Sequence, residues 1–167
     1  MRYTWNKYDK RGINMQEYVL DQTDDLWQSF AHQIAKVSWN AGAFLAKRML
    51  NDQFSDWERV IVLTDEDQLV GFCAVVKEDV VEGTGLAPFI GFVFVNEQYR
   101  GHHLSQRLVR DAESQIAKIG FHQAYIVTAH VGLYEKLGYQ QIDTQTNIFG
   151  RPMRVLAKKI AINDNKE

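Results

Sequence analysis

The chain has 167 residues, of which 46% are hydrophobic and 24% are charged, and its formal net charge at pH 7 is -2. This composition excludes wholesale disorder and a collagen-like repeat, and the lack of a broad positive charge argues against nucleic acid or an anionic membrane as a partner. The single cysteine, Cys73, excludes an intrachain disulfide, and no apolar stretch suggests a signal peptide. We therefore expect one cytoplasmic domain over residues 1–167.

The first third of the chain predicts a short strand and a helical region. Side chains alternate within residues 3–8 in a way that suits a strand. Between residues 24 and 51 apolar residues recur three or four positions apart, which predicts a helical segment capped by Thr23 or Asp24. Weak helix formers around Gly42 are compatible with one long helix or with two helices broken near that glycine.

Strands dominate the middle of the chain. Residues 59–64 and 68–76 predict two antiparallel strands, joined by an acidic turn at residues 65–67. The glycines and proline of residues 80–88 predict a surface loop. Residues 89–95 are almost wholly apolar, which predicts a central strand that is covered on both faces.

The last part of the chain alternates helices and strands. Apolar residues from Leu104 to Ile119 predict a helix that ends at Gly120. The remaining predicted elements are a strand, a short helix closed by Gly138 and two strands, at residues 124–128, 131–137, 139–145 and 153–160. This order predicts a mixed α/β fold, with a mostly antiparallel sheet of six or seven strands and helices on both faces.

The stretch YRGHHLSQRLV, residues 99–109, joins the apolar strand to the long predicted helix. Backbone N–H groups in the first turn of a helix have no internal partners, and together with the helix dipole they bind phosphate readily. Gly101 allows a tight turn and a close approach of an anion, while Arg100 adds positive charge. An ordinary strand-to-helix turn with a solvated Arg100 fits these residues as well, and neither GxGxxG nor GxxxxGK[ST] can be written through them.

We expect neither a metal site nor a reactive thiol. Adjacent residues such as His102 and His103 point about 100° apart on a helix and to opposite faces of a strand, so they do not converge easily on one ion. Cys73 follows Phe72 in an apolar strand and has no basic neighbour, which predicts a buried and inert thiol.

The sequence resembles the GNAT superfamily of N-acetyltransferases in two motifs. Residues 100–105, RGHHLS, occupy the frame of the family's [Q/R]xxGx[G/A] motif after a similar strand and loop, and LYEKLGY, residues 133–139, is similar to its second signature. The order of elements matches over the last two-thirds of the chain. His103 and Ser105 depart from the family's small residues, and Val127 stands where the family often has asparagine.

This resemblance implies an acetyl-CoA-dependent N-acetyltransferase of GNAT-like fold that needs no metal. The diphosphate would bind backbone amides of residues 100–105, and the pantetheine arm would pair with the strand near Phe94 and Val95. The implied cofactor-binding residues are Phe94, Val95, Arg100, Gly101, His102, His103, Leu104 and Ser105. The implied acceptor is a primary amine of a small molecule or peptide, with no nucleic acid and no membrane as partner, and a homodimer is a further expectation.

Direct attack of an amine on a thioester needs a neutral nucleophile and a proton for the leaving thiolate. Tyr134 matches the family tyrosine that is often the general acid, and its alternative role is to pack the short helix. His130 could act as general base, or it could bond the backbone at a helix start. Glu78, Asp79 and Glu82 could attract a cationic amine, or they could simply be solvated on a loop.

Two further points bear on function. Trp39 lies near the expected helix break, in a region that commonly shapes the acceptor pocket of this superfamily, so it could form an aromatic wall for the acceptor. The departures at His103 and Val127 keep open a second function, a CoA-binding sensor that has lost the chemistry. A protein-interaction domain without ligand is a third reading, which predicts no thermal shift with acetyl-CoA.

Overall fold

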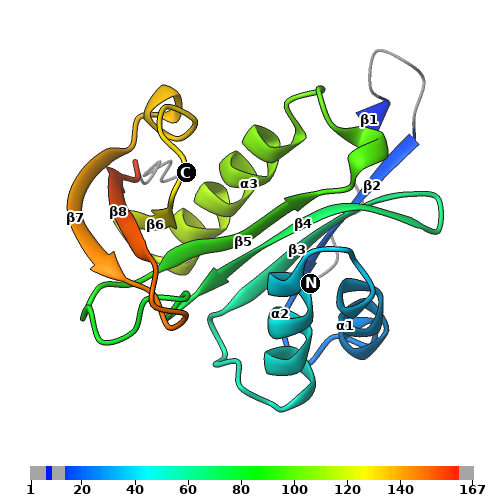
Figure 1. The fold of residues 1–167 in the computed structure, drawn as a ribbon. Helices are drawn as coiled ribbons and strands as arrows, with labels where there is room; N and C mark the ends of the chain where they lie inside the picture. Colours follow the sequence, from blue (N-terminus) through cyan, green and yellow to red (C-terminus); the bar gives the residue numbers. More distant parts are fainter. Residues whose placement is uncertain (1–6, 9–13, 162–167) are drawn as a thin grey trace, which may run out of the picture. The chain divides into compact units, whose positions relative to one another are not determined.

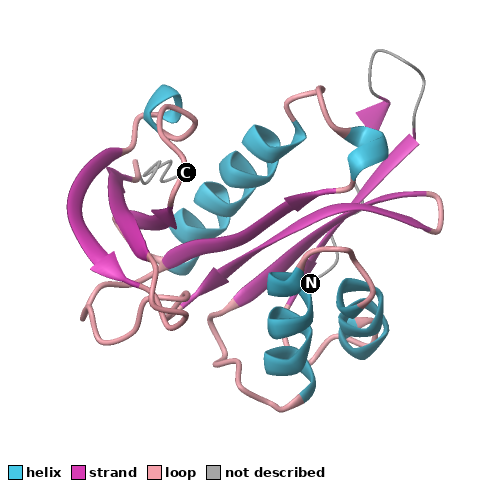
Figure 2. Ribbon diagram, in the orientation of Figure 1, coloured by secondary structure: helices cyan, strands magenta, loops and turns pink. Residues whose placement is uncertain are grey.

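The structure, a computed structural model, describes residues 7–8 and 14–161 (Figure 1). The chain forms two compact units, Met1–Ala74 with Phe92–Leu108, and Val75–Gly91 with Val109–Glu167. The described elements, in chain order, are β1 (Lys7–Tyr8), β2 (Asn14–Leu20), α1 (Trp27–Ala35), α2 (Asn40–Leu50), β3 (Arg59–Asp65), β4 (Gln68–Val76), β5 (Phe89–Val95), η1 (Glu97–Tyr99), α3 (Leu104–Ile119), β6 (Gln123–Thr128), η2 (Glu135–Leu137), β7 (Gln140–Thr146) and β8 (Pro152–Lys159) (Figure 2).

The sheet of the first unit has the strand order β1–β2–β3–β4–β5. Strand β2 pairs antiparallel with β1, where Met15 lies opposite Lys7. It also pairs antiparallel with β3, from Met15 opposite Asp65 to Leu20 opposite Val60. The acidic turn between β3 and β4 lies where the sequence predicts it, so these two adjacent strands form the expected pair.

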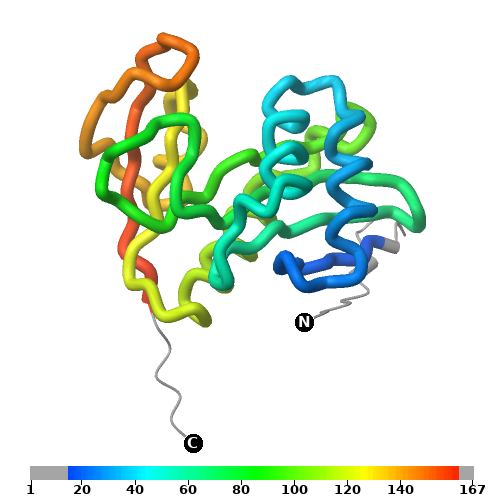
Figure 3. The backbone as a smooth tube through the Cα atoms, turned by 90° about the horizontal axis from the view of Figure 1, so that it is seen from below, coloured from blue at the N-terminus to red at the C-terminus, as the bar shows by residue number. Residues whose placement is uncertain are grey.

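Helices lie on both faces of the first unit's sheet. Successive side chains of a strand point to opposite faces, so Phe72 of β4 points away from the side that holds Gly71 and Cys73. A Cβ at Gly42 of α2 would lie 3.7 Å from Phe72, whereas one at Gly71 would lie 3.5 Å from Leu108 of α3. Helices α1 and α2 lie side by side (Figure 3). Helices α1 and α2 therefore cover one face of this sheet, and the start of α3 covers the other face.

In the second unit, β6 lies next to the first residues of β5 in the sheet. Strand β8 lies next to β6, and β7 lies next to β8. Strand β6 runs parallel to β5, with Phe89 opposite Tyr125, and antiparallel to β8. Strand β7 pairs antiparallel with β8 and has an irregular register between Gln141 and Asp143. Strand β7 stands last in the strand order, so it forms an edge of the sheet, and every one of its residues is exposed.

The predicted fold class is confirmed. Apart from the two-residue β1, the described chain has seven strands in a mixed and mostly antiparallel arrangement, with three α-helices. The helix that ends at Gly120 and the buried strand β5 have the predicted bounds. Strand β2, by contrast, is not among the predicted elements. The strand expected within residues 3–8 can be checked only at Lys7–Tyr8, since residues 3–6 lie outside the described part.

The helical region is two helices, and the break lies at residues 36–39, a few positions before Gly42. Helix α1 ends at Ala35 and α2 begins at Asn40, so Gly42 lies inside the first turn of α2. A Cβ at Gly42 would lie 2.5 Å from Val37 Cγ2 and 3.0 Å from the Ile34 carbonyl oxygen. The glycine therefore serves the close approach of the helices rather than a break.

Two smaller predictions also need correction. The N-cap residue of α1 is Leu26, and the Asp24 carboxylate instead accepts the Asp21 N–H at 3.0 Å. The short helix expected at residues 131–137 is limited to the single 3-10 turn η2, which Gly138 closes with a φ of 96°, as predicted. Residues 129–134 form a loop that hydrogen bonds hold in place.

Candidate functional site

The loop between β5 and α3 has two residues in the left-handed region of φ, Gly101 at 84° and His103 at 59°. The His103 carbonyl oxygen accepts the Arg107 N–H at 3.1 Å, so the N–H groups of Leu104 and Ser105 precede the first intrahelical bond. A Cβ at Gly101 would meet no atom within 4 Å. The loop therefore leaves room beside a set of backbone donors, a geometry that suits an anion.

His103 stands where the motif has glycine, and its backbone conformation shows how a histidine is accommodated there. Only glycine reaches positive φ without cost, yet His103 adopts the conformation that a glycine would have at this place. The left-handed backbone conformation is thus present here although the residue is not glycine. The side chains of His102 and His103 are exposed, whereas that of Leu104, the first residue of α3, is buried.

Hydrogen bonds fix the ends of this loop. The Arg100 guanidinium Nε donates to the carbonyl oxygen of Val95 at 3.0 Å, which brings two of the predicted cofactor-binding residues together. The Tyr99 hydroxyl lies 2.9 Å from Asp65 Oδ2 and 3.0 Å from Gln68 Oε1. Burial, together with the hydrogen bond to Asp65, raises the pKa of Tyr99. The loop is therefore anchored to the end of β5 and to the turn between β3 and β4.

Strand β5 is irregular just before the residues expected to hold the pantetheine arm. Phe92 has a φ of 56° in the middle of the strand, a conformation that is strained for an aromatic residue. Phe94 is buried and Val95 is half-buried, and the Phe94 carbonyl oxygen would lie only 2.5 Å from a Cβ at Gly71. Gly91 directly precedes Phe92, but the residue with positive φ is the phenylalanine itself, whose type does not indicate this conformation.

The two predicted catalytic side chains lie in the second unit, on the loop before η2. Tyr134 is 9% exposed, and its ring lies edge-on to that of Tyr139, with 6.3 Å between the ring centroids. His130 is exposed, and its N–H donates to the Thr128 hydroxyl oxygen at 3.0 Å. Both residues thus belong to one short loop that follows β6.

Arg154 of β8 holds this loop in place, although no motif in the sequence singles it out. Its guanidinium donates to the His130 carbonyl oxygen at 2.6 Å and forms an ion pair with Glu135. The Glu135 carboxylate also accepts the Gly132 N–H at 2.8 Å. The hydrogen bond from Arg154 lowers the pKa of the Glu135 carboxyl group. Arg154 and Glu135 are therefore positioning residues for the loop that carries Tyr134.

The acidic residues after β4 differ in exposure. Asp79 is buried, and its carboxylate accepts the Val80 N–H at 2.7 Å, whereas Glu78 and Glu82 are exposed. Of these three acidic residues, the two glutamates therefore lie on the surface and Asp79 does not. Cys73 is buried and its thiol lies 3.6 Å from the Leu108 carbonyl oxygen, in agreement with the expected buried thiol.

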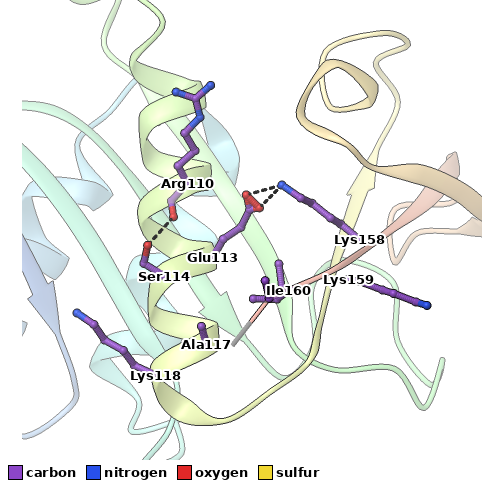
Figure 4. A pocket seen from close by; sticks show the side chains of 9 residues that line it. Arg110, Glu113, Ser114, Ala117, Lys118, Lys158, Lys159 and Ile160 are labelled. Atoms are coloured by element: carbon purple, nitrogen blue, oxygen red, sulfur yellow. Dashed lines mark hydrogen bonds and ion pairs between the residues drawn. The ribbon is translucent and has the colours of Figure 1, made fainter. Parts of the chain in front are cut away.

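The second unit also has an open groove of about 620 Å³ between α3 and the end of β8 (Figure 4). Its basic side chains are those of Arg110, Lys118, Lys158 and Lys159. Lys158 is paired with Glu113, at 2.8 and 3.0 Å from its carboxylate oxygens. The other three basic side chains point away from one another in Figure 4. They do not converge on one point, so this groove is no counterpart of the loop at Arg100.

The described part of the chain has neither a cluster of metal ligands nor a helix that could span a membrane. Residues 7–8 and 14–161 hold no group of three His, Cys, Asp or Glu side chains that could bind a metal ion. None of the helices in this part of the chain combines the length and the apolar character needed to cross a membrane.

Comparison with known proteins identifies the family. The model of the acetyltransferase (GNAT) domain matches residues 56–141, just over half of the chain. No curated protein matches the sequence. The structure is similar to aminoglycoside 6'-N-acetyltransferase from Enterococcus faecium, with 19% identity and a TM-score of 0.65 over 87% of this chain and 97% of that one.

Two other solved structures give a similar result. A variant of spermidine N-acetyltransferase from Vibrio cholerae has 14% identity and a TM-score of 0.62, over 90% of this chain and 96% of that one. An aminoglycoside 6'-N-acetyltransferase complexed with coenzyme A has 18% identity and a TM-score of 0.62, over 87% and 97%. At these identities the likeness establishes the fold, and the domain match establishes the family. The chain belongs to the GNAT family of acetyltransferases.

Proposed function

We propose that residues 1–167 form a single N-acetyltransferase domain that moves the acetyl group of acetyl-CoA to a primary amine by direct attack in a ternary complex. The family match at residues 56–141 includes residues of both units, which supports one domain. The observation that carries the proposal is the loop at residues 100–103, with its two left-handed residues and the amides that open α3.

The donor would bind through backbone groups of the first unit. The amides at the start of α3 and the Arg100 guanidinium are the donor types that a diphosphate requires, so the residues present fit acetyl-CoA. The pantetheine amides would pair with the β5 backbone near Phe94 and Val95, as an added strand does. Because backbone groups do the binding, His103 and Ser105 are compatible with it.

The reaction requires two proton movements. The amine nitrogen attacks the thioester carbonyl carbon, a C–N bond forms, the C–S bond breaks and the nitrogen loses one proton. A backbone N–H near Val95 would stabilise the oxyanion, and His130 would take the proton from the amine, directly or through water. Tyr134 would donate a proton to the leaving thiolate, which gives the amide and the free thiol of CoA. A reducing compartment such as the cytoplasm is compatible with the buried Cys73 thiol.

Melting temperature against acetyl-CoA, CoA and ATP tests the binding step. A ligand at a hundredfold excess over its Kd stabilises the folded state by about 2.7 kcal/mol, so acetyl-CoA and CoA are expected to raise Tm and ATP to raise it less. Release of thiol over a panel of primary amines then tests turnover. A shift in Tm without thiol release would favour the CoA-binding sensor, and no shift would contradict both functions.

Replacing His103 by glycine is expected to stabilise the protein. A left-handed conformation costs an ordinary residue roughly 1–2 kcal/mol, part of which glycine loses again to its freedom in the unfolded chain. A net gain of about 1 kcal/mol would raise Tm by about 2–4 °C. Thermal unfolding measures this, and His103→Ala is the control, since it removes the imidazole but keeps the strain. A lower Tm for His103→Gly would show that the imidazole itself holds the loop.

A further inference from the structure

A stack of three aromatic rings runs from the surface of the first unit to its core. Trp39, the last residue before α2, lies parallel to Phe94 of β5, with 5.9 Å between the ring centroids and 10° between the ring planes. Phe94 in turn stacks on Phe72 of β4, at 5.1 Å and 25°. Phe72 and Phe94 are buried, whereas Trp39 is 37% exposed. Trp39 therefore presents an aromatic surface on a rigid support.

A second ring pair extends this surface along the same strand. Phe44 of α2 stacks on Phe92 of β5, at 6.1 Å and 19°. Phe44 is half-buried, so part of its ring is accessible beside the buried Phe92. Both pairs join the start of α2 to β5, the strand along which the pantetheine arm would lie. A group that binds on Trp39 would therefore lie beside the bound donor.

The charge of the two helices opposes a polycationic ligand. The sequence from Leu26 to Leu50 contains neither Asp nor Glu, but it contains Lys36, Lys47 and Arg48, and of these Arg48 forms an ion pair with the buried Glu58 at 3.9 Å. A polyamine or an aminoglycoside carries several ammonium groups, for which acidic side chains are the complementary partners, and one exposed Trp ring does not supply a partner for each of them. The two helices beside Trp39 therefore offer aromatic surface and no acidic side chain.

We propose that Trp39 binds a flat apolar group of the acceptor, and that the acceptor is an arylalkyl primary amine rather than a polyamine or an aminoglycoside. This inference rests on the proposed function, because it assigns the acceptor class of the same site. Aromatic rings stack in offset or edge-on arrangements, so an exposed Trp ring favours an aryl group over an open alkyl chain.

Steady-state thiol release with four amines tests this inference. The amines are 2-phenylethylamine, n-butylamine, spermidine and kanamycin. We expect 2-phenylethylamine to have the highest kcat/KM. Trp39→Ala is expected to raise the KM for 2-phenylethylamine about tenfold or more, with the KM for acetyl-CoA unchanged, and Trp39→Phe to restore most of the loss. Leu50→Ala is the matched control, since Leu50 is 39% exposed at the far end of α2, and it is expected to change neither KM.

The outcomes separate this inference from the function on which it rests. Thiol release that is fastest with spermidine or kanamycin, or a KM for 2-phenylethylamine that Trp39→Ala leaves unchanged, would overturn the acceptor class only. An increase in the KM for acetyl-CoA would also overturn it, because Trp39 would then serve the donor. No thiol release with any of the amines would overturn the proposed function and this inference with it.

Discussion

Replacing Tyr134 by phenylalanine is expected to lower kcat by about tenfold or more, because proton transfer by a positioned side chain contributes 10²–10⁴-fold in typical enzymes. The substitution removes one oxygen and keeps the ring, which is 9% exposed and packed edge-on against Tyr139. Folding should therefore be nearly unchanged. The Kd for acetyl-CoA should also be unchanged, because the donor would bind to backbone groups of β5 and α3. Thiol release and calorimetry measure the two quantities.

Tyr139→Phe is the matched control for this prediction. Tyr139 is the ring partner of Tyr134, and its hydroxyl lies 3.4 Å from Glu113 Oε2. Its phenol oxygen thus has a structural partner on α3, and its removal is expected to lower Tm slightly while kcat stays within a factor of about two. If Tyr134→Phe and Tyr139→Phe have the same kcat as the unaltered protein, Tyr134 only packs the loop and the thiolate takes its proton from elsewhere.

The bracing of the Tyr134 loop shows how far the sequence could predict the site. The motif LYEKLGY points to Tyr134, but the residue that holds the loop is Arg154, about twenty positions away on β8. Neither its contact with the His130 carbonyl oxygen nor its ion pair with Glu135 has a local signal in the sequence. A motif can thus single out a candidate catalytic residue such as Tyr134, whereas the residues that hold its loop depend on strand pairing.

The same distinction applies to the fold. Helix α3 and strand β5 were predicted with their bounds because glycine and apolar residues mark them locally. Strand β2 was missed, since it contains Glu17, which is 8% exposed and pairs with Arg107 of α3 at 3.3 Å. A buried carboxylate in a strand becomes intelligible only once its distant partner is known. The left-handed conformation of His103 could not be predicted from the sequence either, because histidine does not indicate a positive φ.

Replacing Gly71 by alanine is expected to destabilise the first unit and to weaken acetyl-CoA binding. The new Cβ would lie 2.5 Å from the Phe94 carbonyl oxygen and 3.4 Å from Val95 Cα, so backbone atoms of β5 would have to move. Overpacking of this kind costs about 1–3 kcal/mol. A loss near 3 kcal/mol lowers Tm by roughly 6–12 °C in a chain of this size. Since the pantetheine arm would pair with Phe94 and Val95, the same movement should raise the Kd for acetyl-CoA.

Gly83→Ala is the control for Gly71→Ala. It also replaces a glycine by alanine, but it creates no clash with β5. A Cβ at Gly83 would meet no atom within 4 Å, and its φ of 72° makes the substitution costly by about 1–2 kcal/mol through the backbone alone. This control should lower Tm and leave the Kd for acetyl-CoA unchanged. Gly71→Ala should lower Tm and also raise the Kd for acetyl-CoA, because its clash falls on the strand that we propose binds the donor. A Gly71→Ala protein that melts lower but binds acetyl-CoA with undiminished affinity would place the pantetheine arm away from β5.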